Sequence, residues 1–139
     1  MRIVIDPGVF ISALIKPMGV PGLLIEYVLR GHVTIIICPW MIEELQRVLL
    51  RTKFRRYFSE DQGRRLVEEI TRLAESFDDP RQPARVAPDP HDDYLIALAL
   101  LSGADVVISG DRHLTGMDSS PVRVMTPRQL LDVLRDGMS

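Results

Sequence analysis

The chain has 139 residues, 46% of them hydrophobic, which fits a single folded domain, residues 1–139, with its own core. A formal net charge of −2 excludes a uniformly basic nucleic-acid-binding surface but allows a local basic patch. The single cysteine, Cys38, has no partner for an intrachain disulfide, which fits a reducing compartment. Residues 1–6 do not form a signal peptide, and no apolar run approaches the roughly 18 residues of a membrane span. We therefore expect a soluble, cytoplasmic protein with no membrane association.

The first half of the chain alternates between strand and helix patterns. Residues 3–5 form a short β-branched run, and residues 9–15 and 21–29 are typical of helices. Residues 33–37 predict a second strand, which is apolar on both faces, as expected for a central parallel strand with helices on either side. Pro39 then begins a helix that we expect to reach about Arg51.

The middle of the chain predicts one long helix and then a loop. Ser59 and Gln62 form a capping box, and the apolar stripe that follows predicts a helix ending near Ser76. Residues 78–90 contain four prolines and predict a loop with at most one short strand, around residues 85–87.

The last third returns to alternating elements. A helix from Asp92, stopped by Gly103, is apolar nearly all round and is expected to be buried. Residues 105–109 and 122–125 predict two more strands, and Thr126 opens a final helix as part of a second capping box. Strands that alternate with helices predict an α/β fold: a three-layer α/β/α sandwich around a central parallel sheet of four to five strands.

Four acidic residues follow the predicted strands closely: Asp6, Glu44, Asp92 and Asp111. In a parallel sheet, functional groups collect beyond the carboxyl ends of the strands, so these carboxylates can face one crevice. Such a cluster is costly unless a cation neutralises it, and ligands that are oxygen only favour Mg²⁺ or Mn²⁺ over zinc. Taken singly, Asp92 could be a helix N-cap, Asp111 a turn residue and Glu44 a partner of the helix macrodipole. A structural role is hardest to assign to Asp6, because an acid that ends a buried strand needs a partner.

Four segments together resemble the PIN domain family, in particular its bacterial toxin components of toxin–antitoxin systems. The segments are residues 3–14, 43–49, 89–99 and 104–111, and they match in order and spacing over nearly the whole chain. The resemblance implies a PIN-like fold and an Mg²⁺- or Mn²⁺-dependent endoribonuclease that hydrolyses RNA phosphodiester bonds. It places the catalytic and metal-binding acids on Asp6, Glu44, Asp92 and Asp111, with Asp93 as an auxiliary acid and Ser109 as a hydroxyl near the site. It also implies a small antitoxin partner and a homodimer.

One position departs from the family pattern. Where the family has Asn or Ser two residues after the first acid, this chain has Gly8, which has no side chain to orient Asp6 or a metal-bound water. Loss of a residue that supports a metal ligand commonly costs about 10- to 100-fold in affinity or activity. The alternative reading is therefore a catalytically weakened or inactive module of the PIN fold that binds RNA or a protein partner.

Residues 51–58, Arg-Thr-Lys-Phe-Arg-Arg-Tyr-Phe, mix basic and aromatic side chains and could flank the crevice. Positive charge and stacking surfaces together are typical of single-stranded nucleic-acid binding. The predicted RNA-binding residues are Arg51, Lys53, Arg55 and Arg56. The alternative is a solvated corner whose Phe54 and Phe58 pack into the core or against a partner.

Two further interpretations concern single residue types. His91 and His113 lie near the acids in sequence and could assist proton transfer, or they could be loop histidines.

A receiver-type phosphoacceptor domain would share the acidic crevice, but it needs a lysine after a late strand. The only lysines are Lys16 and Lys53, and neither follows a late strand, so a receiver-type domain is the least favoured of the interpretations.

Overall fold

The computed structural model describes the backbone of residues 1–81, 90–116 and 120–137, and the side chains in these ranges other than those of residues 90–92 and 113. The predicted strand around residues 85–87 lies outside the described residues. The elements, in chain order, are β1 (Arg2–Ile5), α1 (Pro7–Ile15), α2 (Val20–Leu29), β2 (Thr34–Ile37), α3 (Pro39–Leu49), the 3₁₀ turn η1 (Thr52–Phe54), α4 (Glu60–Leu73), β3 (Glu75–Ser76), α5 (Pro90–Ser102), β4 (Val106–Ile108), α6 (Arg112–Thr115), β5 (Arg123–Met125) and α7 (Pro127–Gly137).

The strands of the described residues form one parallel sheet in the order β3-β2-β1-β4-β5. The chain builds outward from β1 through β2 to β3, then crosses to the other side of β1 for β4 and β5. The winding therefore reverses between β1 and β4, and such a switch point leaves a crevice at the carboxyl ends of the two strands. Thus the predicted α/β architecture is confirmed, and the crevice is located beside β1.

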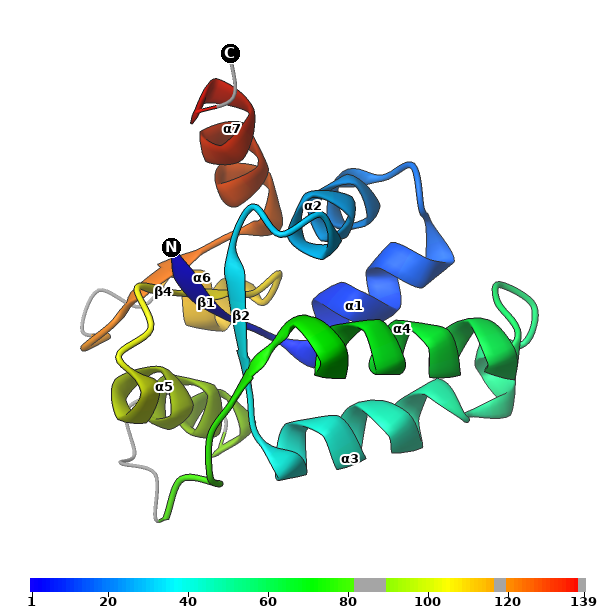
Figure 1. The fold of residues 1–139 in the computed structure, drawn as a ribbon, viewed down its shortest axis with the longest axis horizontal. Coiled ribbons are helices and arrows are strands. Elements are labelled where there is room, and N and C mark those ends of the chain that lie inside the picture. Colours follow the sequence, from blue (N-terminus) through cyan, green and yellow to red (C-terminus); the bar gives the residue numbers. More distant parts are fainter. Residues whose placement is uncertain (82–89, 117–119, 138–139) are drawn as a thin grey trace.

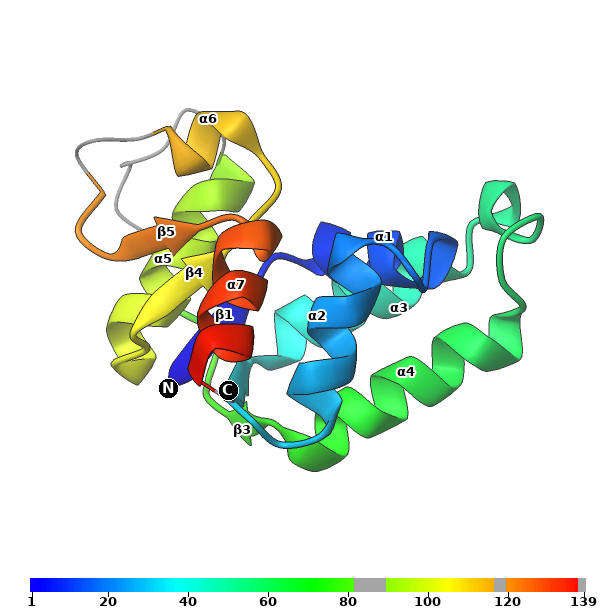
Figure 2. The same cartoon turned by 90° about the horizontal axis from the view of Figure 1, so that it is seen from above.

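Helices cover both faces of this sheet (Figures 1 and 2). Helix α5 packs against β1, β2 and β4, whereas α2 and α7 pack together on the other side, where α2 also contacts α1. Helices α3 and α4 form a hairpin that projects beyond the sheet. Strand β1 is central and its residues Ile3, Val4 and Ile5 have no exposed surface, which explains why it is apolar on both faces.

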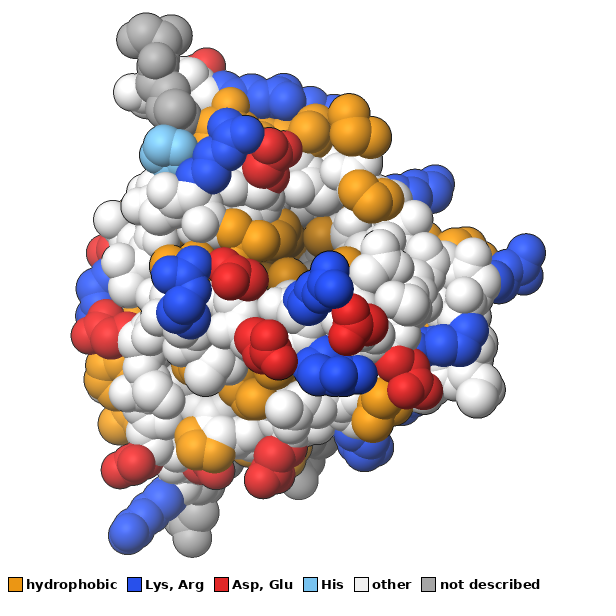
Figure 3. All heavy atoms as spheres, turned by 45° about the vertical axis from the view of Figure 1, so that its right-hand side comes forward, with side chains coloured by type: hydrophobic (Ala, Val, Ile, Leu, Met, Phe, Trp, Pro, Cys, Tyr) orange, Lys and Arg blue, Asp and Glu red, His pale blue; other side chains and the backbone are white. Residues whose placement is uncertain are grey.

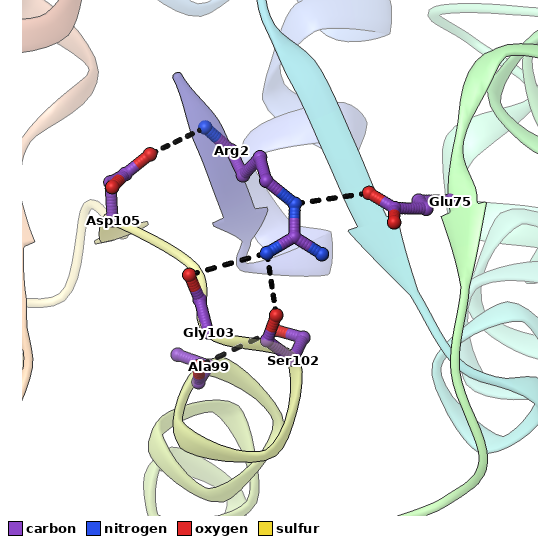
Figure 4. A network of polar contacts seen from close by, with 6 residues as sticks. All are labelled: Arg2, Glu75, Ala99, Ser102, Gly103 and Asp105. Atoms are coloured by element: carbon purple, nitrogen blue, oxygen red, sulfur yellow. Dashed lines mark hydrogen bonds and ion pairs between the residues drawn. The ribbon is translucent and has the colours of Figure 1, made fainter.

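Arg2 forms hydrogen bonds that connect several elements at the amino-terminal edge of the sheet, opposite the crevice (Figure 4). Its Nε donates to Glu75 Oε2 at 3.0 Å, its Nη1 donates to the Ser102 carbonyl at 2.6 Å, and its backbone N donates to Asp105 Oδ2 at 2.8 Å. One side chain thereby joins β1, β3 and the turn between α5 and β4. Gly103 in that turn has φ +69°, a conformation that favours glycine.

Local sequence signals set several element boundaries as predicted. Ser59 and Gln62 exchange both hydrogen bonds of a capping box at the start of α4, and Thr126 and Gln129 do the same for α7. Cys38 is buried, as expected for a small apolar residue. Among the described residues, no single helix is long and apolar enough to cross a membrane, and α1 with α2 reaches that length only across a 110° bend.

The structure corrects the prediction in three places. The helix that was expected to reach Ser76 ends at Leu73, because residues 75–76 pair with β2 as an edge strand. Helix α5 is buried along Tyr94–Ile96 but exposes Leu100 and Leu101, since a helix in an outer layer has only one side against the sheet. The short helices η1 and α6 had no sequence signal that we recognised.

Candidate metal centre

Asp6 lies at the carboxyl end of β1 and is the N-cap of α1. Its Oδ1 accepts a hydrogen bond from the backbone N–H of Gly8 at 3.1 Å, and its own N–H donates to the carbonyl of Ile108 at 2.9 Å. The strand fixes the backbone of Asp6, and the helix start fixes one of its carboxylate oxygens. The acid therefore lies at the switch point of the sheet, where the sequence placed it.

Ser109 links Asp6 to Asp111. Its hydroxyl donates to Asp6 Oδ2 at 3.0 Å and accepts from the backbone N–H of Asp111 at 3.0 Å, and Ser109 has no exposed surface. The pairing of Ile5 with Ile108 continues naturally to Asp6 beside Ser109, which brings the hydroxyl and the carboxylate together. The buried serine thus orients the carboxylate from β4 and fixes the turn that carries Asp111.

Asp6 and Asp111 line the same hollow, which has a volume of about 290 Å³. Its other lining residues are Gly8, Val9, Ser12, Pro21, Gly110 and Pro127. Ser12 lies one helical turn beyond Gly8, so its place in the hollow could have been predicted from the sequence. Pro21 and Pro127 could not have been predicted in this way, because only the packing of α2 and α7 brings them to the hollow. A larger apolar hollow of about 380 Å³ lies between α3 and α4 and contains none of the four predicted acids.

The remaining predicted acids occupy α3 and α5. Glu44 is partly buried on α3 and its Oε2 atom is buried, while Asp93 on α5 is buried. The backbone of Asp92 lies in the first turns of α5, but its side chain lies outside the described residues, as does that of His113. Within the described residues, no three His, Cys, Asp or Glu side chains gather closely enough to hold a metal ion together. Thus Asp6 and Asp111 share one hollow, and the approach of Glu44 and Asp92 to them stays a prediction.

Trp40 and Tyr94, which the sequence did not single out, pack with Cys38 at the carboxyl end of β2, the strand beside β1. The sulfur of Cys38 lies 2.7 Å from the hydroxyl oxygen of Tyr94, and the Trp40 ring packs edge-on against the Tyr94 ring with centroids 4.0 Å apart. Burial raises the pKa of the Cys38 thiol. Burial, together with the hydrogen bond to Cys38, also raises the pKa of the Tyr94 hydroxyl, so both groups stay neutral.

Segment 51–58 lies at the tip of the α3–α4 hairpin, at the far end of α3 from the sheet (Figure 1). Arg55 donates through Nη2 to the Leu49 carbonyl at the end of α3, and its guanidinium lies 5.3 Å from the Phe58 ring centroid. Phe58 is buried and Phe54 stacks on it, as the alternative reading of this corner expected. Arg55 is therefore engaged in the fold.

The exposed cations of this tip are Arg51, Lys53 and Arg56. Lys53 and Arg56 each lie over the aromatic ring that follows them in sequence, with distances to the ring centroids of 5.2 Å and 5.3 Å. Tyr57 is the exposed aromatic residue of the segment. Acidic and basic side chains intermix on this side of the molecule, so any basic surface is local (Figure 3).

A family model described as PIN domain matches residues 2–113. The chain belongs to the PIN domain family. The match runs from β1 into α6 and so includes the switch point and all four predicted acids. PIN domains are generally nucleases, and those nucleases generally use divalent metals.

One sequence relative and two solved structures are similar to this chain. The chain is 26% identical to the uncharacterised protein MJ1680 of Methanocaldococcus jannaschii, over 95% of this chain and 90% of that protein. The crystal structure of PAE2754 from Pyrobaculum aerophilum superposes with a TM-score of 0.63 at 17% identity, covering 98% of this chain and 90% of that one. VapBC2 from Rickettsia felis, crystallised with a DNA fragment from its promoter, gives a TM-score of 0.61 at 12% identity, covering 91% and 98%. The relative MJ1680 is archaeal, so the bacterial assignment stays a prediction.

Proposed function

We propose that this PIN domain is a divalent-metal-dependent endoribonuclease, the toxin of a cytoplasmic toxin–antitoxin pair. The observation that carries the proposal is the link Asp6–Ser109–Asp111: Ser109 orients the carboxylate of Asp6 and holds the backbone of Asp111, and both acids line one hollow at the switch point of the sheet. A helix cap and a turn could each form alone, whereas the buried hydroxyl of Ser109 joins the two at one edge of the sheet.

The residues of the hollow suit Mg²⁺ or Mn²⁺. Mg²⁺ is usually bound through one or two carboxylates, with waters and substrate phosphate completing its shell, and Asp6 and Asp111 supply that number. Glu44 and Asp92 would add ligands, directly or through water, and the buried Asp93 would support them. When bound, such a cation neutralises charge on the reacting phosphate and lowers the pKa of a bound water.

The chain itself contributes position and charge. The carboxylate of Asp6 has one oxygen fixed by Gly8 N–H and the other by Ser109 O–H, so its geometry does not depend on the solvent. The N-terminus of α1, which points at the hollow, favours the negative charge of a phosphate. Pro21 and Pro127, at the starts of α2 and α7, complete the wall of the hollow.

Substrate binding would extend along the hairpin. Arg51, Lys53 and Arg56 offer positive charge at its tip, and the exposed ring of Tyr57 can stack on a base. Arg55 would act by holding this tip in shape, since it donates to the end of α3. The proposed partners are an RNA substrate, a small antitoxin protein and a second copy of the chain.

The alternative is a weakened or inactive PIN-fold module that binds RNA or a protein, and Gly8 favours it. Gly8 leaves Asp6 Oδ1 with a backbone donor where the family pattern offers a side chain. A calorimetric titration with Mn²⁺ separates the two functions, because a module without the metal would show no binding.

The decisive experiment is RNA cleavage in Mg²⁺ or Mn²⁺ by the wild-type protein, Asp6→Asn and Asp111→Asn. We expect cleavage that EDTA abolishes and that both variants lose. Asp132→Asn is the matched control, because that acid is exposed on α7 and pairs only at 4.0 Å with Arg128. Full activity in Asp6→Asn and Asp111→Asn would rule the nuclease assignment out.

A further inference from the structure

Trp40, the single tryptophan of the chain, lies at the carboxyl edge of the sheet, where β2 ends. The register of β1 with β2 pairs Val4 with Ile36, and continuing it by two residues brings Asp6 level with Cys38. Trp40 follows Cys38 by two residues, in the first turn of α3. It therefore lies at the same edge of the sheet as Asp6, on the opposite side from Ser109.

The indole is partly exposed, although the structure fixes its position. Trp40 is 42% exposed, its backbone N–H donates to Asp79 Oδ1 at 2.9 Å, and its ring meets that of Tyr94 at an interplanar angle of 87°. Tyr94 is buried and hydrogen-bonded to Cys38, so the surface on which the indole rests is rigid. A large aromatic group that is pre-positioned and still exposed loses little conformational entropy when it binds a ligand.

Two of the predicted acids stand on the same helices as this ring and its partner. Glu44 follows Trp40 by four residues on α3, so the two side chains share one face of the helix. Asp93 immediately precedes Tyr94 on α5, the residue against which Trp40 packs. Two of the predicted acids are therefore sequence neighbours of Trp40 or of the residue that its ring contacts.

We propose that Trp40 stacks on an unpaired nucleobase adjacent to the phosphate bound at the acidic crevice. This inference rests on the proposed function and assigns it a base-contacting residue. In a duplex the bases stack on each other and are not available to the indole, whereas an unpaired base can leave its neighbour and stack on Trp40. Stacking reads the face of a base, so the preference would be for strandedness more than for sequence.

The first test uses the fluorescence of Trp40 in the wild-type protein. The protein is titrated with a short single-stranded RNA in Mg²⁺, and with an oligomer of the same length that has the sugar–phosphate backbone but no bases. We expect quenching by the RNA and none by the abasic oligomer, with the recovered RNA checked for integrity. Absence of quenching at saturating RNA would overturn the inference without the need for a variant.

The second test compares affinities by anisotropy of a labelled RNA. Trp40→Ala is expected to weaken RNA binding roughly 5- to 150-fold, the equivalent of one stacked base, and Trp40→Phe much less. The abasic oligomer should bind wild type and Trp40→Ala alike. Leu101→Ala is the control, since Leu101 is also an exposed apolar residue, 54% exposed, at the other end of α5.

The outcomes separate this inference from the nuclease assignment. Quenching by RNA in a protein that never cleaves it would keep Trp40 as a stacking residue and refute the nuclease. Cleavage of RNA, with equal RNA affinity in wild type and Trp40→Ala, would support the nuclease and refute stacking by Trp40. A fluorescence change produced by raising the protein concentration alone would assign the exposed ring to a contact between copies of the chain and overturn the inference.

Discussion

The hydroxyl of Ser109 provides the sharpest test of how the acidic site is built. Ser109→Ala removes a donor to the Asp6 carboxylate and an acceptor from the backbone N–H of Asp111, and leaves the strand otherwise intact. A hydrogen bond to a charged group contributes about 1.5–3 kcal/mol and a neutral one about 0.5–1.5 kcal/mol. The variant should therefore lower the free energy of unfolding by roughly 2–4.5 kcal/mol. It should also weaken Mn²⁺ binding about 10- to 100-fold, because a metal ligand loses its support.

Urea denaturation followed by circular dichroism measures the first quantity, and isothermal calorimetry with Mn²⁺ measures the second. The matched control is Ser102→Ala, which removes another buried hydroxyl, one that donates only to the Ala99 carbonyl of its own helix. It should change stability little and Mn²⁺ affinity not at all. If Ser109→Ala costs no more than Ser102→Ala in both assays, then Ser109 does not orient Asp6 and the proposed architecture of the site is wrong.

Three other expectations test separate features. Gly8→Ser should raise Mn²⁺ affinity, because a Cβ at Gly8 would lie 3.7 Å from Asp6 Oδ1 with no other close neighbour, and calorimetry against Gly8→Ala isolates the hydroxyl. Arg55→Met should lower stability by about 1–3 kcal/mol in urea denaturation, whereas Arg56→Ala should leave stability unchanged and weaken RNA binding. Cys38 should resist alkylation until the protein unfolds. Because burial raises its pKa in the folded state, stability should fall as the pH rises above about 8.5, and Cys38→Ala should reduce that loss.

Much of the fold could be predicted because its signals are local. The apolar runs of the central strands, the capping boxes at Ser59 and Thr126, and the proline that opens α3 act within a few residues of their own position. The edge strand β3 could not be predicted in this way. Its two residues continue the pattern of α4, and only their pairing with Ile36 and Ile37, distant in the sequence, decides their conformation.

The residues of the candidate site likewise divide into those that local sequence signals place and those that only tertiary packing places. Asp6 and Asp111 stand at strand ends, and the order of the strands brings such positions together, so the sequence pattern could place them. The pairing of Trp40 with Tyr94 depends on how α3 and α5 approach each other, for which no local signal exists. The role of Arg55 also depends on tertiary structure. Its basic neighbours in the sequence predict nucleic-acid binding, but in the fold its guanidinium donates to the Leu49 carbonyl at the end of α3.

Gly8 and Ser109 both donate a hydrogen bond to the carboxylate of Asp6. Whether the absence of a side chain at Gly8 lowers metal affinity therefore depends on how far Ser109 compensates for it. Asp6 Oδ1 is held by a backbone N–H and Oδ2 by a serine hydroxyl, so both oxygens are oriented without a side chain at position 8. If Ser109 compensates for Gly8, then Ser109→Ala should cost more Mn²⁺ affinity in the wild-type background than in Gly8→Ser, where a second hydroxyl can take over. A double-mutant cycle by calorimetry measures this difference. Equal losses in both backgrounds would mean that the two positions act independently, and that Gly8 lowers metal affinity whatever Ser109 does.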